Sequence, residues 1–136
     1  MRLWHKDLIP FLPRQQLLGQ WRECCLIARQ IATNGAPNHI LVDQIMDYPI
    51  DHFVRYGIMV SDEMFDRGYT VNKDAFLKYL YPNFLIEQPL FEGWHDDIYL
   101  RECLYNLEEK YRASGITYDE WMIIYNRFHD FTPLIF

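Results

Sequence analysis

The sequence has few cysteines, no long apolar run and no excess of positive charge, and each shortage excludes a class of protein. No apolar run reaches the roughly 18 residues that a membrane-spanning helix needs, and the first residues, Met-Arg-Leu-Trp-His-Lys, lack the apolar segment of a signal peptide. The cysteines Cys24, Cys25 and Cys103 are odd in number, and two of them adjoin on an apolar helix face. We therefore expect buried thiols in a cytoplasmic protein that does not bind a membrane.

The formal net charge of −6 argues against a general affinity for nucleic acid, which comes largely from lysine and arginine side chains that neutralise phosphates. The charge is unevenly distributed. Residues 1–30 carry five cationic and two anionic side chains. The other 106 residues carry eight cationic and seventeen anionic side chains. This asymmetry is compatible with a local patch that faces phosphate.

Several catalytic motifs are missing from the chain. It contains no His-Glu-x-x-His, no Cys-x-x-Cys, no glycine-rich phosphate loop and no nucleophile elbow. The five histidines are scattered, and His95-Asp96-Asp97 at an expected helix start is more typical of an N-terminal charge arrangement than of a ligand set. We expect neither a metal ion nor an organic cofactor.

The composition indicates one globular domain over residues 1–136. Half of the 136 residues are apolar, and ten Tyr, nine Phe and four Trp provide large rings for a core. No stretch shows the alternation and turn signals of strands. The sequence therefore predicts an all-α, compact single-domain fold of about five helices with an ordered N-terminal arm over residues 1–13.

Proline, glycine and capping residues set the expected helix bounds. Long helices are expected over residues 14–32, 49–67 and 95–113, and shorter ones over 73–81 and 117–128, the last opened by a Thr117–Glu120 capping box. A further short helix is expected over residues 38–46. The same pattern predicts that Phe65 and Ile98 point inward and that Gly57 is a point of close helix packing. It also predicts that the loop 82–94 packs against the core.

The helix over residues 14–32 organises the rest of the chain. Its core side is expected to hold Leu17, Leu18, Trp21, Cys24, Cys25, Ala28 and Ile31, and its opposite side Gln15, Gly19, Arg22, Glu23 and Leu26. A glycine inside a helix costs about 1 kcal/mol relative to alanine, so Gly19 can indicate that another group approaches closely. Periodicity alone favours the simpler interpretation, a packing notch beside a solvated Arg-Glu pair.

Two segments resemble a known family. Leu8 to Glu23 is similar to the pyrimidine-dimer DNA glycosylases of the phage-type endonuclease V family, which have a Gln, a Leu and an aromatic-Arg-Glu triplet where this chain has Gln15, Leu17 and Trp21-Arg22-Glu23. The second segment, Asp66-Arg67-Gly68-Tyr69-Thr70-Val71, matches a turn of the same family. The resemblance covers residues 1–71 and is thin afterwards.

The resemblance implies an enzyme whose N-terminal α-amine attacks the sugar C1′ of a damaged pyrimidine and forms an imine, after which β-elimination nicks the strand. Glu23 would be the catalytic carboxylate and Arg22 would hold a phosphate. Since the bulky Arg2 should prevent removal of Met1, the α-amine of Met1 would be the nucleophile. An ordinary α-amine has a pKa of about 8, so a larger fraction of it is neutral at physiological pH than of a lysine side chain.

For DNA contact we expect Arg2, Gln15 and Arg14 to face damaged double-stranded DNA, and Arg22 and Glu23 to line a concave basic surface with Arg2 and Gln15. Two departures from the phage pattern weaken this affinity. Leu26 stands where the family has a basic residue, and the segment Tyr118 to Phe136 is acidic and aromatic instead of basic and aromatic. The substrate therefore stays open between a pyrimidine dimer, another lesion and an abasic site.

Two functions follow from the sequence. The first is a monomeric DNA glycosylase and abasic-site lyase, and the second is a non-catalytic helical interaction protein that retains the same fold. The separation of the Met1 amine from Glu23 distinguishes them, because the first function requires these two groups to be close.

Overall fold

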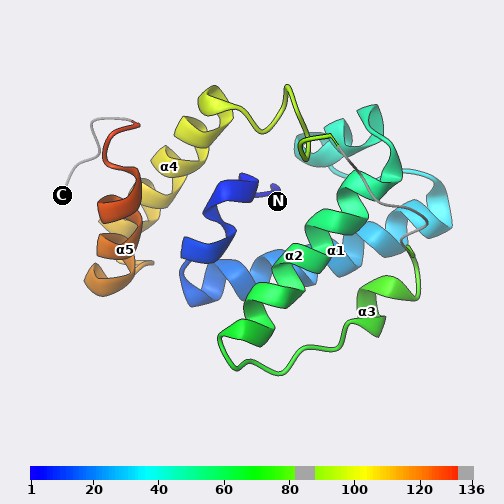
Figure 1. Ribbon diagram of the computed structural model, residues 1–136, viewed down its shortest axis with the longest axis horizontal. Helices are drawn as coiled ribbons and strands as arrows, with labels where there is room; N and C mark the ends of the chain where they lie inside the picture. Colours follow the sequence, from blue (N-terminus) through cyan, green and yellow to red (C-terminus); the bar gives the residue numbers. More distant parts are fainter. Residues whose placement is uncertain (82–87, 132–136) are drawn as a thin grey trace.

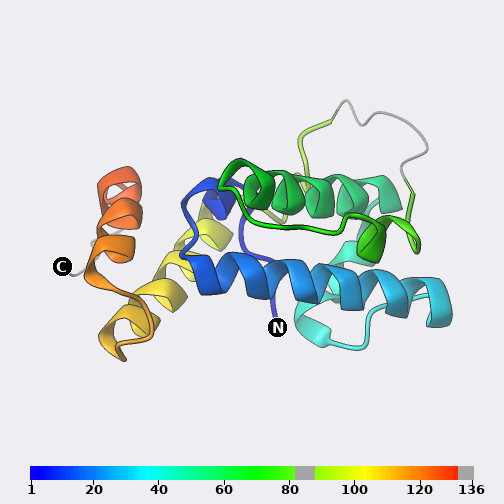
Figure 2. The same cartoon turned by 90° about the horizontal axis from the view of Figure 1, so that it is seen from below.

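Two long helices that run side by side in opposite directions form the centre of the molecule (Figure 1, Figure 2). They are α1 (Arg14–Asn34) and α2 (Ile50–Asp66). The computed structural model describes residues 1–81 and 88–131, and these ranges contain helices but no strand. The predicted all-α class is confirmed. Within the same ranges, no helix is long and apolar enough to cross a membrane.

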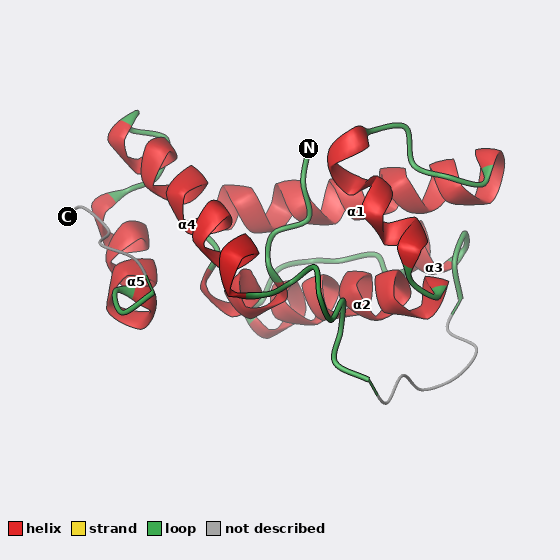
Figure 3. Ribbon diagram, turned by 90° about the horizontal axis from the view of Figure 1, so that it is seen from above, coloured by secondary structure: helices red, strands yellow, loops and turns green. Residues whose placement is uncertain are grey.

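The other elements surround this pair (Figure 3). A short 3₁₀ helix, η1 (Lys6–Phe11), precedes α1, and a second one, η2 (Ile40–Asp47), joins α1 to α2. One turn of helix, α3 (Asp74–Leu77), follows α2, and α4 (Asp97–Arg112) and α5 (Tyr118–Phe128) lie at the opposite end of the molecule from α3 (Figure 1). The capping box that opens α5 forms as predicted, with the side chains of Thr117 and Glu120 satisfying each other's backbone amides.

Several details differ from the sequence prediction. The segment 73–81 forms one helical turn, and the helix expected over residues 38–46 is a 3₁₀ helix. Phe65 and Ile98, expected inside, are 69% and 66% exposed. Met64 takes the inward place in the last turn of α2, and the buried stripe of α4 begins at Leu100, so each of the two mispredicted side chains falls outside its helix's packed face.

The loop between α3 and α4 packs against the core in its described part. Leu90, Phe91 and Trp94 are buried there, as expected, while the first half of the loop, residues 82–87, lies outside the described residues. Of the thiols, Cys24 and Cys103 are buried, Cys25 is half-buried, and all three are free.

Gly57 is the closest packing point of α2, as the sequence predicts. A Cβ atom built on it would lie 2.4 Å from the tip of the Phe76 ring. Phe76 is fully buried and also contacts Phe53 and Trp21, with ring centroids 5.5 and 5.8 Å apart. Because rings on several sides confine it, Phe76 has little room to move.

We predict that Gly57→Ala lowers the free energy of unfolding by about 1–3 kcal/mol, the usual cost of overpacking a core. Gly19→Ala is the matched control, because its added Cβ would meet only Arg22 Nη2 at an ordinary 3.8 Å. Since alanine favours a helix by about 1 kcal/mol over glycine, the control should be neutral or stabilising. Urea unfolding followed by circular dichroism measures both, and an equal response of the two variants would contradict the packing argument.

Candidate active site

The first five residues form an extended arm that lies between α1, α2 and α4 (Figure 3). Leu3 is fully buried, and the Tyr99 hydroxyl of α4 donates a hydrogen bond to its carbonyl. The Tyr56 hydroxyl of α2 donates to the Trp4 carbonyl over 2.6 Å. At the end of the arm, the Lys6 amide donates to Nδ1 of His95 over 3.0 Å. Two helices and the loop before α4 therefore hold the arm and the residue that follows it through side chains.

Gln20 is the main attachment of the arm to α1. Its Oε1 accepts hydrogen bonds from the Trp4 amide (2.7 Å) and the Tyr56 hydroxyl (2.9 Å). Its Nε2 donates to the Arg2 carbonyl (3.1 Å) and to Oε2 of Glu23 (3.3 Å). The side chain is 1% exposed, so all of its hydrogen bonds are made inside the protein.

Glu23 lies one helical turn after Gln20 on the same side of α1, and it is half-buried. Burial raises the pKa of its carboxyl above the ordinary value. The strongest opposing influence is the α-amine of Met1, and the backbone amide of Arg2, the Arg22 guanidinium and His39 also favour the ionised form. The amine of residue 1 is thus within electrostatic range of the carboxylate that the sequence singles out.

A comparison with known families identifies the chain. A family model described as pyrimidine dimer DNA glycosylase matches residues 1–77, more than half of the chain. The chain belongs to this family. A function of the DNA glycosylase type follows from the membership. No curated protein sequence and no solved structure matches the chain.

The second family-like segment, around Arg67, holds the residues that lead from η1 into α1. The Arg67 guanidinium pairs with Glu63 over 2.8 Å and donates to the carbonyls of Leu12 (2.8 Å) and Pro10 (3.2 Å). It therefore joins the end of α2 to the segment that leads from η1 into α1. In this member of the family the motif has a structural role.

The structure brings only some of the predicted site residues together. Arg22 is adjacent to Glu23 in α1 and is exposed, with its guanidinium folded back over Gly19. Gln15 and Arg14 are also exposed, but they precede Glu23 by eight and nine residues, or about 12–14 Å along a helix. The Arg14 guanidinium stacks over the Tyr69 ring at 5.0 Å.

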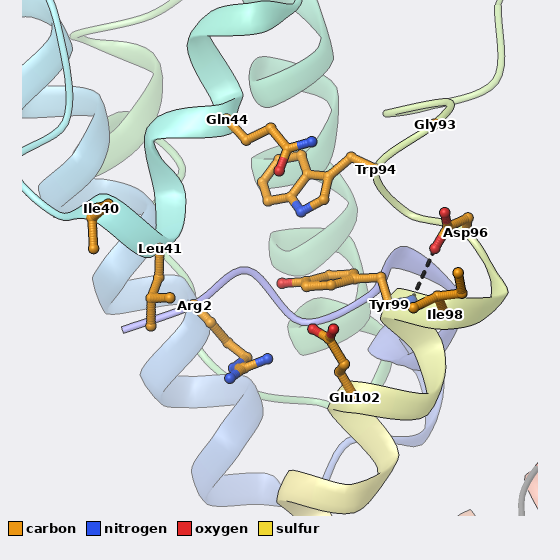
Figure 4. A pocket seen from close by; sticks show the side chains of 10 residues that line it. All are labelled: Arg2, Ile40, Leu41, Gln44, Gly93, Trp94, Asp96, Ile98, Tyr99 and Glu102. Carbon is orange, nitrogen blue, oxygen red and sulfur yellow. Dashed lines mark hydrogen bonds between the residues drawn. The ribbon is translucent and has the colours of Figure 1, made fainter.

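The Arg2 side chain points into a cleft of about 370 Å³ between the arm, η2 and the start of α4 (Figure 4). Trp94 and Tyr99 form part of its wall, and the carboxylates of Asp96 and Glu102 also line it. This cleft differs from the concave basic surface that we expected, because Arg2 shares it with two acidic side chains and not with Gln15, Arg22 and Glu23. The described part of the chain holds no cluster of three or more His, Cys, Asp or Glu side chains that could bind a metal ion.

Sequence reasoning missed Gln20 and Tyr56. A signal for Gln20 was present, because positions 17, 20, 21, 24, 27 and 28 follow the usual spacing of a buried helix stripe, and all six are buried. A glutamine inside such a stripe must find buried hydrogen-bond partners. Tyr56 carries no comparable signal, since one more aromatic residue on an apolar face is ordinary.

The buried His95 makes the attachment of the arm sensitive to acid. Burial lowers the pKa of His95 to about 2, with smaller contributions from His5, which stacks on it at 5.2 Å, and from Lys6. In the unfolded chain a histidine titrates near about 6.5. Between these values the unfolded chain binds more protons, so stability is lost as the pH falls below about 6.5.

We predict that His95 alone lowers the free energy of unfolding by about 1 kcal/mol between pH 7 and pH 5.5. His95→Asn keeps an acceptor for the Lys6 amide without a titrating ring, so it should flatten this part of the pH dependence. The exposed His129→Asn is the control and should leave the slope unchanged. Urea unfolding at a series of pH values measures the slope, and identical slopes for wild type and His95→Asn would contradict the prediction.

Proposed function

We propose that the chain is a DNA glycosylase with abasic-site lyase activity, in which the α-amine of Met1 is the nucleophile and Glu23 the catalytic carboxylate. The observation that carries the proposal is that Gln20 hydrogen-bonds both the Arg2 carbonyl and Oε2 of the half-buried Glu23, which brings the residue after Met1 close to this carboxylate. Membership of the pyrimidine dimer DNA glycosylase family supports DNA as the substrate. The substrate we propose is damaged double-stranded DNA.

The chemistry needs one neutral amine and one carboxyl group that exchanges protons. The amine attacks C1′ of the damaged nucleotide, the bond from C1′ to the base breaks, and the amine nitrogen loses a proton. The C1′–O4′ bond then breaks, O4′ takes up a proton, and an imine joins residue 1 to C1′ of the opened sugar. A base then removes a proton from C2′, and the C3′–O bond breaks with release of the 3′ phosphate group. Glu23 is placed to stabilise the cationic character at C1′ and to accept the C2′ proton.

The environment of Glu23 suits this task. Burial raises the pKa of its carboxyl, which makes the carboxylate a stronger base than an exposed glutamate would be. The nearby amine and guanidinium keep the ionised form accessible. We expect the acidic limb of the activity profile to follow this carboxyl, with activity lost as the pH falls through its raised pKa and the base becomes protonated.

Arg22 is the proposed phosphate contact beside the reacting sugar, since its exposed guanidinium has a forked geometry that fits phosphate. Arg2, Gln15 and Arg14 are proposed as further DNA contacts. The cleft around Arg2 contains two carboxylates, which repel phosphate, so the arginine there is better suited to a base edge or a sugar than to the backbone.

The covalent intermediate provides the main test. Borohydride should trap a complex of the protein with an oligonucleotide that holds an abasic site or a pyrimidine dimer, and peptide mapping should place the adduct on residue 1. Glu23→Gln should reduce nicking by at least about 100-fold while the fold remains, because it removes the charge and the proton transfer but keeps the shape.

Glu109→Gln, an exposed carboxyl change on α4, is the matched control and should nick normally. A Gly-Ser extension before Met1 should abolish trapping. An adduct on an internal lysine, or undiminished nicking by Glu23→Gln, would contradict the mechanism. Absence of trapping on every lesion would instead favour the non-catalytic interaction protein.

Binding to DNA should be weak because few cations face it, and it should weaken further as the salt concentration rises because those cations contact phosphates. The two proposed phosphate contacts, Arg22 and Arg14, correspond to a slope of log K against log salt of about −2. Arg22→Gln should make this slope shallower by about 1, whereas Lys110→Gln, an exposed change on α4, should not alter it. Fluorescence anisotropy with a labelled abasic duplex measures the slope, and a salt-independent affinity would count against phosphate contact.

A further inference from the structure

Gln20 is a polar residue in an otherwise apolar stripe of α1, and its side chain forms hydrogen bonds to the arm and to Glu23. Its neighbours in the stripe, Leu17, Trp21 and Cys24, bury apolar groups, and a leucine at position 20 would continue the pattern. Instead the amide uses both of its ends, accepting two hydrogen bonds and donating two. Leaving one buried donor or acceptor without a partner costs about 1–3 kcal/mol of stability. The four hydrogen bonds therefore fix the orientation of the Gln20 amide.

The orientation of the amide follows from its partners. The Trp4 amide can only donate and the Arg2 carbonyl can only accept, so Oε1 must face Trp4 and Nε2 must face Arg2. The Nε2 group then has one remaining hydrogen, and it points to Oε2 of Glu23. The network thus presents a donor, and never an acceptor, to the carboxyl of Glu23.

Gln20 and Glu23 together hold residue 2 from both sides of its backbone. The Arg2 carbonyl accepts from Gln20, while the Arg2 amide favours the ionised form of Glu23. These two side chains are one helical turn apart on a rigid helix, so the arm is held in one register at the residue that follows Met1.

We infer that Gln20 is a positioning residue, whose side-chain amide holds the Met1 amine and the Glu23 carboxylate in their reactive arrangement by bridging the Arg2 carbonyl, the Trp4 amide and Glu23. The inference rests on the proposed function for its consequence in catalysis. Gln20 touches neither the sugar nor the base, and it acts through the two groups that do. Tyr56 supports it from α2, because its single hydroxyl hydrogen is shared between the Trp4 carbonyl and Oε1 of Gln20.

Gln20→Glu and Gln20→Leu separate the two halves of the network. In Gln20→Glu the new carboxylate still accepts from Trp4 and Tyr56 but offers no donor to Arg2 or Glu23, and it adds a like charge beside Glu23. Gln20→Leu removes both halves. Gln30→Glu is the matched control, because Gln30 lies on the same helix and accepts from the Asn38 amide (3.1 Å) seven residues beyond Glu23.

The first measurement uses the free protein without DNA. Hydrogen exchange at the Trp4 amide should speed up at least tenfold in Gln20→Leu and remain slow in Gln20→Glu and Gln30→Glu. Carbon-13 NMR of the Glu23 carboxyl should show titration at a pH about one unit higher in Gln20→Glu than in wild type. Beyond position 20, the groups that influence this titration are the Met1 amine, Arg22, His39, Tyr56 and Cys24, and the variant leaves all of them in place.

The second measurement is single-turnover borohydride trapping with a saturating abasic duplex. Gln20→Glu should trap at least tenfold more slowly than wild type at neutral pH, with its acidic limb moved to higher pH and an unchanged Kd for the duplex. Ile124→Val, a mild core change in α5, controls for general destabilisation and should trap at the wild-type rate.

The outcomes are separable. If Glu23 titrates alike in wild type and Gln20→Glu, or if Gln20→Glu traps no more slowly than Gln30→Glu, the positioning inference is overturned. If wild type traps no DNA while the exchange and titration shifts appear, the proposed function fails and the arrangement of the arm by Gln20 stands. If Gln20→Leu does not fold, Gln20→Glu still decides, because it keeps the acceptor half of the network.

Discussion

The structure depends on one constraint, the satisfaction of the backbone of an extended arm that is buried among helices. A strand in a sheet pairs its amides and carbonyls with a neighbouring strand, but helices have already used their own backbone groups. The arm must therefore find side-chain partners. It finds them in Gln20, Tyr56 and Tyr99, which come from α1, α2 and α4, and in His95 of the loop before α4, which accepts from the amide of Lys6 just after the arm. The N-terminal residues are held in place by this network rather than by apolar contact alone.

This constraint connects the fold to the chemistry. Because the arm is fixed at Arg2 and Trp4, the residue before them is brought into the electrostatic range of Glu23. The same burial that holds the arm also raises the pKa of the Glu23 carboxyl. A chain with a net charge of −6 can thus concentrate an amine, a guanidinium and a carboxylate at one end of its arm, although it has 19 acidic and only 13 basic side chains.

The part of the chain beyond the family match contributes to the same site. The match ends at residue 77, yet Tyr99 of α4 and His95 of the loop before it, which lie beyond the match, hold the arm. Asp96 and Glu102 of the same region line the cleft into which Arg2 points (Figure 4). The second half of the molecule therefore completes the support of the arm and introduces acidic side chains beside it, which distinguishes this site from a purely basic surface.

The sequence by itself determined the helices, their caps and the residues that the family resemblance singles out. Periodicity, glycine and proline report local preferences, so α1, α2, α4 and the capping box of α5 were predictable to within a few residues. Gly57 was predictable as a close contact for the same reason, since a glycine inside a helix is a local anomaly. The Trp21-Arg22-Glu23 triplet directed attention to Glu23, and Met1 followed from the resemblance.

Only the tertiary structure decided how these parts meet. The partners of the arm are 16 to 96 residues away in sequence, and no local pattern encodes which side chain will satisfy a given amide or carbonyl. The sequence marks Gln20 as a buried helix position but does not show that the arm lies beside it. The sequence also places Arg2 in a basic segment, whereas in the structure two carboxylates line the cleft that Arg2 enters. Hydrogen-bond partners and local charge depend on which segments are brought together in space, and that is a property of the packed chain.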